Sequence, residues 1–198
     1  MAGSPAPTFL LLMKRPILKT NRLILRPPVL EDAPAIQQYV SDRRIAETTA
    51  LIPHPYPEGG ALEWIRRSEI TLREGRGVDF SILLRGSGEL VGVVGLIDRD
   101  VESSLGYWIA VPHWGNGYAT EAVHRVIRHA FNARRLPSLH AYHFAHNPAS
   151  GRVMQKAGFL YEGVEPLGSS REGVRYDRVC YGVTAQQWRD NLRTFSLV

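Results

Sequence analysis

The clearest pattern in the chain is an apolar stripe of helical period between residues 119 and 131. Its members recur at i, i+3, i+4, i+7, i+8, i+11 and i+12, the spacing of one face of an α-helix. They are Ala119, Ala122, Val123, Val126, Ile127, Ala130 and Phe131. Polar residues such as Glu121, Arg125 and Arg128 fill the opposite face. The pattern predicts an amphipathic helix that packs on a core.

Weaker helical spacing predicts further helices, and β-rich runs predict strands between them. The predicted helices are residues 31–41, 58–74, 149–157 and a last short one from Thr184 through Trp188. The predicted strands are residues 23–26, 79–85, 89–97, 104–111, 138–145, 159–163 and 174–183. About seven strands and four or five helices in mixed order predict an α/β fold with a mixed sheet. Its hairpin region should be antiparallel, and its strands parallel across the long helix.

The 198 residues are enough for one domain. We expect this domain to span residues 19–198, because residues 1–18 lack a period and resemble a loosely ordered tail. No apolar run approaches the ~20 residues needed to cross a bilayer, so a soluble cytoplasmic protein is expected. Cys180 is the only cysteine, which excludes a disulfide framework and a cysteine-based zinc cluster.

The net charge of +5 arises from 24 basic and 19 acidic residues. Twenty-one of the basic residues are arginine, and they are spread along the chain without a basic run or a nucleic-acid motif. Nucleic acid is therefore not expected as the primary ligand, although a positive protein favours an anionic small molecule.

A turn with two glycines lies between the strand at 104–111 and the long helix. Gly115 and Gly117 let backbone N–H groups approach a ligand, and the first helical turn directs its free N–H groups to the same point. This predicts an anion site. The Walker and Rossmann patterns both fail, because Tyr118-Ala119 replaces the Lys-Ser/Thr pair and Thr120 replaces the third glycine.

Other candidate groups have simpler explanations. His140, His143 and His146 are spaced like a metal motif, but alternate positions on a strand face opposite sides, and no metal is expected. Cys180 is a possible nucleophile, and a core role is favoured over it. The Pro-rich segment 53–57 and Trp64 are candidates for acceptor contacts or for a rigid loop.

Three segments in order resemble the GNAT acyltransferase superfamily and, within it, the RimJ/RimL-like branch. They are Thr20 to Arg26, Gly106 to Ala122, and Asn147 to Phe159 followed by Glu162-Gly163. The resemblance covers about residues 19–190. It implies the GNAT fold, in which the fourth and fifth strands splay apart and acetyl-CoA lies in the gap.

The resemblance also implies the residues that bind the cosubstrate. The pantetheine arm would bond to the backbone of Ile109 and Val111, and the pyrophosphate would rest on N–H groups from Gly115 through Thr120. Asn147 would reach the arm, and Ser150 would lie near the sulfur. The residues implied are Ile109, Ala110, Val111, Trp114, Gly115, Asn116, Gly117, Tyr118, Ala119, Thr120, Asn147 and Ser150. The basic or glutamine residue that usually opens the phosphate loop is replaced by Pro112.

The catalytic acid and base are less clear from the resemblance. Ser150 is implied as a catalytic residue, but Ser104 and Ser169 stand where relatives often carry carboxylates. Glu102 is then the nearest substitute for the base, with Asp98 and Asp100 as weaker candidates. A base that acts through water, or little need for a base, remains open.

We therefore expect an acetyl-CoA-dependent N-acetyltransferase that transfers an acetyl group directly to a primary amine. The acceptor is either a protein N-terminal α-amine, such as that of a ribosomal protein, or a small amine of polyamine or aminoglycoside type. An acidic cleft would favour the small amine. A non-catalytic CoA-binding module is the alternative from another class, and the branch suggests a possible homodimer.

Overall fold

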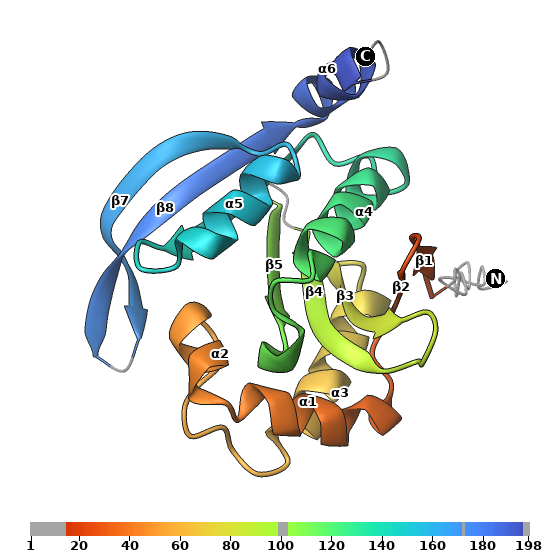
Figure 1. Ribbon diagram of the computed structural model, residues 1–198, viewed down its shortest axis with the longest axis vertical. Coiled ribbons are helices and arrows are strands. Elements are labelled where there is room, and N and C mark those ends of the chain that lie inside the picture. The colour runs from red at the N-terminus through yellow and green to blue at the C-terminus, as the bar shows by residue number, and fades with distance from the viewer. Residues whose placement is uncertain (1–14, 99–102, 172, 196–198) are drawn as a thin grey trace, which may run out of the picture.

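The computed structural model describes residues 15–98, 103–171 and 173–195 and contains one mixed sheet in these residues (Figure 1). Its strands lie in the order β1-β2-β3-β4-β5-β6-β8-β7. All neighbouring strands are antiparallel except β5 and β6, which are parallel. The strands are β1 (Leu18–Lys19), β2 (Leu23–Arg26), β3 (Gly77–Leu84), β4 (Leu90–Ile97), β5 (Ser104–Ile109), β6 (Ser138–Phe144), β7 (Leu160–Arg171) and β8 (Val174–Thr184).

Helices cover both faces of this sheet. They are α1 (Ala33–Val40), α2 (Arg43–Thr48), α3 (Gly60–Arg73), α4 (Tyr118–Asn132), α5 (Pro148–Lys156) and α6 (Ala185–Phe195). Short 3-10 turns precede α1 at Leu30–Asp32 and α4 at Val111–His113. No described helix is long and apolar enough to span a membrane.

The helix predicted from the apolar stripe is confirmed as α4, which lies against the middle of the sheet. Ala122, Val123, Val126, Ile127 and Ala130 are each 0% exposed and pack on the larger core cluster. Strand residues of one sheet face and α5 complete this cluster. The central crossover from β5 through α4 to β6 is thereby fixed by the apolar face of one helix.

A smaller core lies on the other face of the sheet, under α1 and α3. Ile36 and Val40 from α1 meet Ala61 and Ile65 from α3 over Val93 of β4. Partly buried Tyr56, Trp64 and Trp108 pack at its margin. This core places the loop between α2 and α3 beside the central strands.

The predicted splay between the fourth and fifth strands is confirmed between β5 and β6. Their register contains one pair, Ser104 with His140, supported by a hydrogen bond from His140 N to Ser103 O of 2.9 Å. Beyond this pair no ladder joins the two strands in the described residues. A sheet opened in this way can admit a ligand between its strands.

The last hairpin differs from the prediction. We expected a strand of residues 159–163 and a connection before residue 174, but β7 continues to Arg171. Ser169, expected between the last two strands, lies inside β7 and pairs with Tyr176 of β8. Pro166 and Gly168 give this stretch a loop-like composition, and the register shift between Glu165 and Ser169 accommodates them. The long hairpin curves away from the rest of the molecule (Figure 1).

The sequence analysis also missed two short elements, so the described residues form eight strands and six α-helices instead of about seven and four or five. The strand β1 has two residues, of which Leu18 pairs with Leu25 and is buried. The helix α2 has six residues and begins after Asp42, whose side chain accepts a hydrogen bond from Arg44 N. Elements this short carry too few periodic positions to be predicted.

Candidate active site

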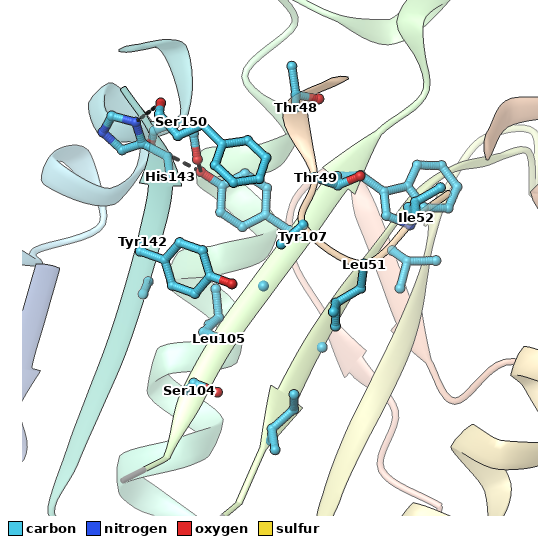
Figure 2. A pocket seen from close by; sticks show the side chains of 18 of the residues that line it. Thr48, Thr49, Leu51, Ile52, Ser104, Leu105, Tyr107, Tyr142, His143 and Ser150 are labelled. Carbon is cyan, nitrogen blue, oxygen red and sulfur yellow. Dashed lines mark hydrogen bonds between the residues drawn. The ribbon is translucent and has the colours of Figure 1, made fainter. Parts of the chain in front are cut away.

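A cleft of about 580 Å³ opens where β5 and β6 diverge. Strand residues form its floor, α5 contributes Ser150 and Met154, and residues 48–52, from the last residue of α2 onward, also line it. Figure 2 shows Tyr107 and Ser150 side by side at one end of this cleft, with Leu51 and Ile52 across the strands from Tyr142. The volume suits a small ligand or the end of a longer one.

Ser150, predicted to be catalytic, lies in this cleft with a tyrosine that the sequence did not single out. The Ser150 Oγ and the Tyr107 hydroxyl are 2.8 Å apart, and the Tyr107 hydroxyl also donates to Ser150 O at 3.1 Å (Figure 2). Burial is the main cause that raises the pKa of Tyr107, and the hydrogen bond to Ser150 only partly opposes it. The phenol therefore stays neutral, and the two hydroxyls form a chain that can pass a proton.

The glycine turn lies at the other end of β5, outside the lining of the cleft. Gly115 and Gly117 have φ of 79° and 77°, in the left-handed region that favours glycine. Gly117 is the N-cap of α4 and offers no side chain to the first N–H groups of the helix. A Cβ at Gly115 would meet nothing within 4 Å. The turn thus presents open space and free helix N–H groups, which fit a pyrophosphate.

An arginine from the first hairpin braces this turn. Arg22 forms a salt bridge with Glu121 at 2.7 Å, donates to Asn116 O at 2.9 Å and lies over the Tyr118 ring at 4.8 Å. Glu121 also accepts a 2.6 Å hydrogen bond from Thr20. Burial would raise the pKa of Glu121, but the hydrogen bonds from Thr20 and Arg22 outweigh it and lower the pKa. Arg22 thus holds the turn, and its charge is paired with that of Glu121.

The end of β5 is engaged by Trp114. The indole N–H of Trp114 donates to Ile109 O at 2.6 Å, and its backbone N–H donates to Val111 O at 3.2 Å. These are the two backbone positions expected to hold the pantetheine arm. A carbonyl oxygen has two lone pairs, so each can still accept a second hydrogen bond. The backbone N–H of Ala110, which lies between these two residues, donates to Val91 O of the neighbouring strand β4 at 2.8 Å.

Asn147 is the N-cap of α5. Its side chain accepts from Ser150 N at 3.4 Å and donates to Thr48 O at 3.5 Å. Asn147 thus orients the first turn of α5, which carries Ser150, and links it to α2. It does not line the cleft.

The candidates for the base are placed unequally. Glu102 and Asp100 lie outside the described residues. Asp98 is bound by Arg134 at 2.6 Å and accepts from Ser103 at 3.0 Å, and it does not line the cleft, so it is a structural ion-pair partner. Ser104 does line the cleft. At this position of β5 the cleft is therefore lined by a hydroxyl group and not by a carboxylate.

The cleft contains other acidic groups that the sequence did not indicate. Asp79 of β3, Glu162 and Glu165 line it, and Arg178, which pairs with Glu165, is the one lysine or arginine among its described lining residues. Burial raises the pKa of Asp79, while a hydrogen bond with Ser68 opposes the rise. The described lining of the cleft therefore carries three carboxyl groups and one arginine within a protein of positive net charge, with Asp79 on β3 and the two glutamates on β7, where His140 Nδ1 lies 3.4 Å from Glu162 Oε2.

The histidines and the cysteine have other roles. His146 bonds to Glu47 O at 2.8 Å, and the ring of His143 bonds to Phe144 O at 2.8 Å. No group of three potential metal ligands occurs among the described residues. Cys180 lines the cleft, and burial, followed by the charge of Glu165, raises its pKa. A raised pKa disfavours the thiolate that a nucleophile requires.

Comparison with known proteins assigns the chain to a family. Residues 22–160 match the family described as "Acetyltransferase (GNAT) domain". The uncharacterized N-acetyltransferase YoaA of Bacillus subtilis is 33% identical over 171 residues, covering 85% of this chain and 96% of its own length. The chain belongs to the GNAT acetyltransferases and is an acetyl-CoA-dependent N-acetyltransferase.

Solved structures agree with this fold. The microcin C7 self-immunity acetyltransferase MccE, in complex with acetyl-CoA and AMP, has a TM-score of 0.75 at 20% identity, covering 83% of this chain and 93% of its own. RimL, a ribosomal L7/L12 α-N-protein acetyltransferase in complex with CoA, has a TM-score of 0.77 at 16% identity, covering 85% and 98%. At these identities the similarity establishes the fold.

Proposed function

We propose that the chain acetylates a primary amine of a small molecule, bound in the cleft between β5 and β6. The observation that carries this proposal is a single cleft whose lining contains both the Ser150–Tyr107 pair and three carboxyl groups. A protonated amine is attracted by such a lining.

The solved neighbours do not select the acceptor, because RimL acts on a protein N-terminus and MccE confers immunity to a microcin. The shape and charge of the cleft favour a small amine. Its volume of about 580 Å³ is in the range of small-molecule sites. Aromatic side chains of Tyr56, Trp64 and Trp108 also line it.

The chemistry assigns roles to the chain's own residues. Acetyl-CoA supplies an activated thioester carbonyl. The pyrophosphate would be held at Gly115 to Thr120, where the turn offers backbone N–H groups. As the amine attacks and the carbon–sulfur bond breaks, the Ser150 hydroxyl would donate a proton to the sulfur. The neutral Tyr107 hydroxyl would orient Ser150 and relay to it the proton that the amine nitrogen releases as the amide forms, so that both hydroxyls end neutral.

Acetyl-CoA turnover with matched acceptors tests this proposal. Thiol release is measured with benzylamine, a linear polyamine and a tripeptide with a free N-terminus. We expect kcat/KM for a small amine to exceed that for the tripeptide by about tenfold or more, the effect of roughly 1.4 kcal/mol. Preference for the tripeptide would contradict the small-amine acceptor, and CoA binding without consumption of any amine would contradict transfer to an amine.

A further inference from the structure

The face of the sheet beneath α1 and α3 has a notch made by one row of residues. Asp79, Gly95 and Gly106 are direct cross-strand partners on β3, β4 and β5. Direct partners point to the same face, so two glycines next to one aspartate leave a gap in the side-chain layer. The flanking rows carry Val93 with Trp108 and Ile97 with Ser104.

The Asp79 carboxylate occupies half of this notch. A Cβ placed on Gly95 would lie 2.5 Å from Asp79 Oδ1, so the carboxylate extends across Gly95 in the space that any side chain would need. A Cβ placed on Gly106 would meet nothing within 4 Å. The space over Gly106 is therefore open and lies next to an acidic group at the end of a row without side chains.

The surroundings of this space suit a cation. Trp108, Trp64 and Tyr56 line the same cleft, and aromatic faces attract ammonium groups. The hydroxyl of Ser68 is the hydrogen-bond partner of Asp79. Among the described residues no charged side chain shifts the pKa of Asp79. The carboxylate is thus partly desolvated and lacks a cationic partner of its own in the described part of the chain.

We propose that the space over Gly106, between the Asp79 carboxylate and Trp108, is the subsite that binds the protonated amine of the acceptor. This inference rests on the proposed function, because it supplies that function with its counter-ion. Asp79 takes the place of the carboxylate that β5 lacks at Ser104. Its position two strands away is compensated by the glycines, since they let the acceptor approach it along the floor of the cleft.

Two variants change the subsite in different ways. Asp79→Asn keeps the shape and the Ser68 hydrogen bond but removes the charge. Gly106→Val fills the open space, and a β-branched residue suits a strand. Glu31→Gln is the matched control, because Glu31 is exposed and outside the cleft lining.

Calorimetry with the CoA-loaded protein provides the direct readout. Benzylamine, protonated at neutral pH, is the probe, and benzyl alcohol is its uncharged analogue. A charge-assisted hydrogen bond predicts that Asp79→Asn weakens benzylamine binding by about tenfold to a hundredfold and leaves benzyl alcohol unchanged. Gly106→Val should weaken both probes, and neither variant should change the affinity for acetyl-CoA. Glu31→Gln should bind like the wild type.

The outcomes separate the subsite from the proposed function. If the wild type acetylates small amines but neither variant changes benzylamine binding or the acceptor KM by more than about twofold, the subsite is wrong and the function stands. If no amine is acetylated but benzylamine binds in an Asp79-dependent way, the subsite stands and the function is wrong. Should Asp79→Asn fail to fold, Gly106→Val decides.

Discussion

At the scale of single residues, burial in one cleft changes the acidity of two groups that the mechanism uses. It raises the pKa of Tyr107, which keeps the phenol neutral beside Ser150. It also raises the pKa of Asp79, whose charged form loses water when the protein folds. Both groups are stabilised in their neutral forms, so a cationic ligand that pairs with Asp79 would restore its charge.

The first prediction concerns Asp79 and pH. A carboxyl with a raised folded pKa favours folding fully below its unfolded pKa, near 3.8, and loses that contribution as the pH rises through the folded value. Asparagine does not ionise, so the Asp79→Asn variant does not lose this stability as the pH rises. The Tm of the variant minus the Tm of the wild type should therefore increase from pH 4 to pH 8. Thermal unfolding without ligand measures this. A difference that does not vary with pH would contradict the assigned burial of the charge.

The second prediction concerns Ser150. Replacing Ser150 with alanine removes the hydroxyl that would protonate the sulfur, so kcat should fall by roughly 100-fold. Tyr107→Phe should lower kcat less, because it removes only the partner of that hydroxyl. Stopped-time assays of thiol release, with acetyl-CoA affinity measured in parallel, provide the test. Unchanged kcat in Ser150→Ala would remove Ser150 from the mechanism.

At the scale of elements, the β5–α4 turn depends on contacts from a distant segment. The hairpin between β1 and β2 holds it through Arg22 and Thr20, which bind Glu121 in the first turn of α4. The sequence shows the glycines and the helix but not this brace, because the two segments are about a hundred residues apart. Their proximity follows only from the packing of α4 against β1 and β2.

The third prediction concerns Gly117. Gly117→Glu places a negative charge where the pyrophosphate is expected, and acetyl-CoA binding should weaken by more than about tenfold. Gly117→Ala is the control, because it has the same strain at a φ of 77° but no charge. Calorimetry compares the two variants. Equal affinities in both would show that the turn does not bind the phosphate.

The fourth prediction concerns the junction of β2, the turn before α1 and β3. Asp32 is buried and accepts hydrogen bonds from Arg26 at 2.7 and 2.8 Å and from Ser81 at 2.7 Å. Burial raises its pKa, but the hydrogen bonds from Arg26, Ser81 and Val29 outweigh burial, so the pKa is lowered.

Asp32→Asn should therefore cost about 3 kcal/mol of unfolding free energy, because it leaves Arg26 without its partner. A lowered folded pKa stabilises the fold above the unfolded pKa, near 3.8, and this stabilisation is lost as the pH falls through the folded value. Urea unfolding at neutral pH and at pH 3 measures both effects. A loss below about 0.5 kcal/mol at neutral pH would contradict the role of this network.

At the scale of the whole molecule, long periodic elements could be predicted from the sequence. The residues that different strands bring next to one another could not. The helix α4 follows from its apolar stripe, and the turn from the glycines that precede it. The role of Asp79 depends on the register that aligns it with Gly95 and Gly106, and no local pattern encodes that register. The extension of β7 past Pro166 was hidden by loop-like residues whose pairing is set by β8.

The fold also determines where the charged residues lie around the site. The net charge is +5, yet the described lining of the cleft carries Asp79, Glu162 and Glu165 against one arginine, Arg178. Arg22 stands beside the glycine turn at the other end of β5. The anionic cosubstrate would therefore meet backbone N–H groups beside the Arg22–Glu121 pair, and the cationic acceptor would meet the carboxyl groups of the cleft.

The central claim is that one cleft joins the CoA sulfur to an acceptor amine through the splay of β5 and β6. A crystal structure of the protein with CoA and benzylamine tests it most directly. The account predicts the pyrophosphate on the N–H groups of Gly115 to Thr120, the sulfur within hydrogen-bond distance of Ser150 Oγ, and the ammonium over Gly106 beside Asp79. A sulfur beyond hydrogen-bond distance of Ser150, or an ammonium away from Gly106 and Asp79, would contradict it.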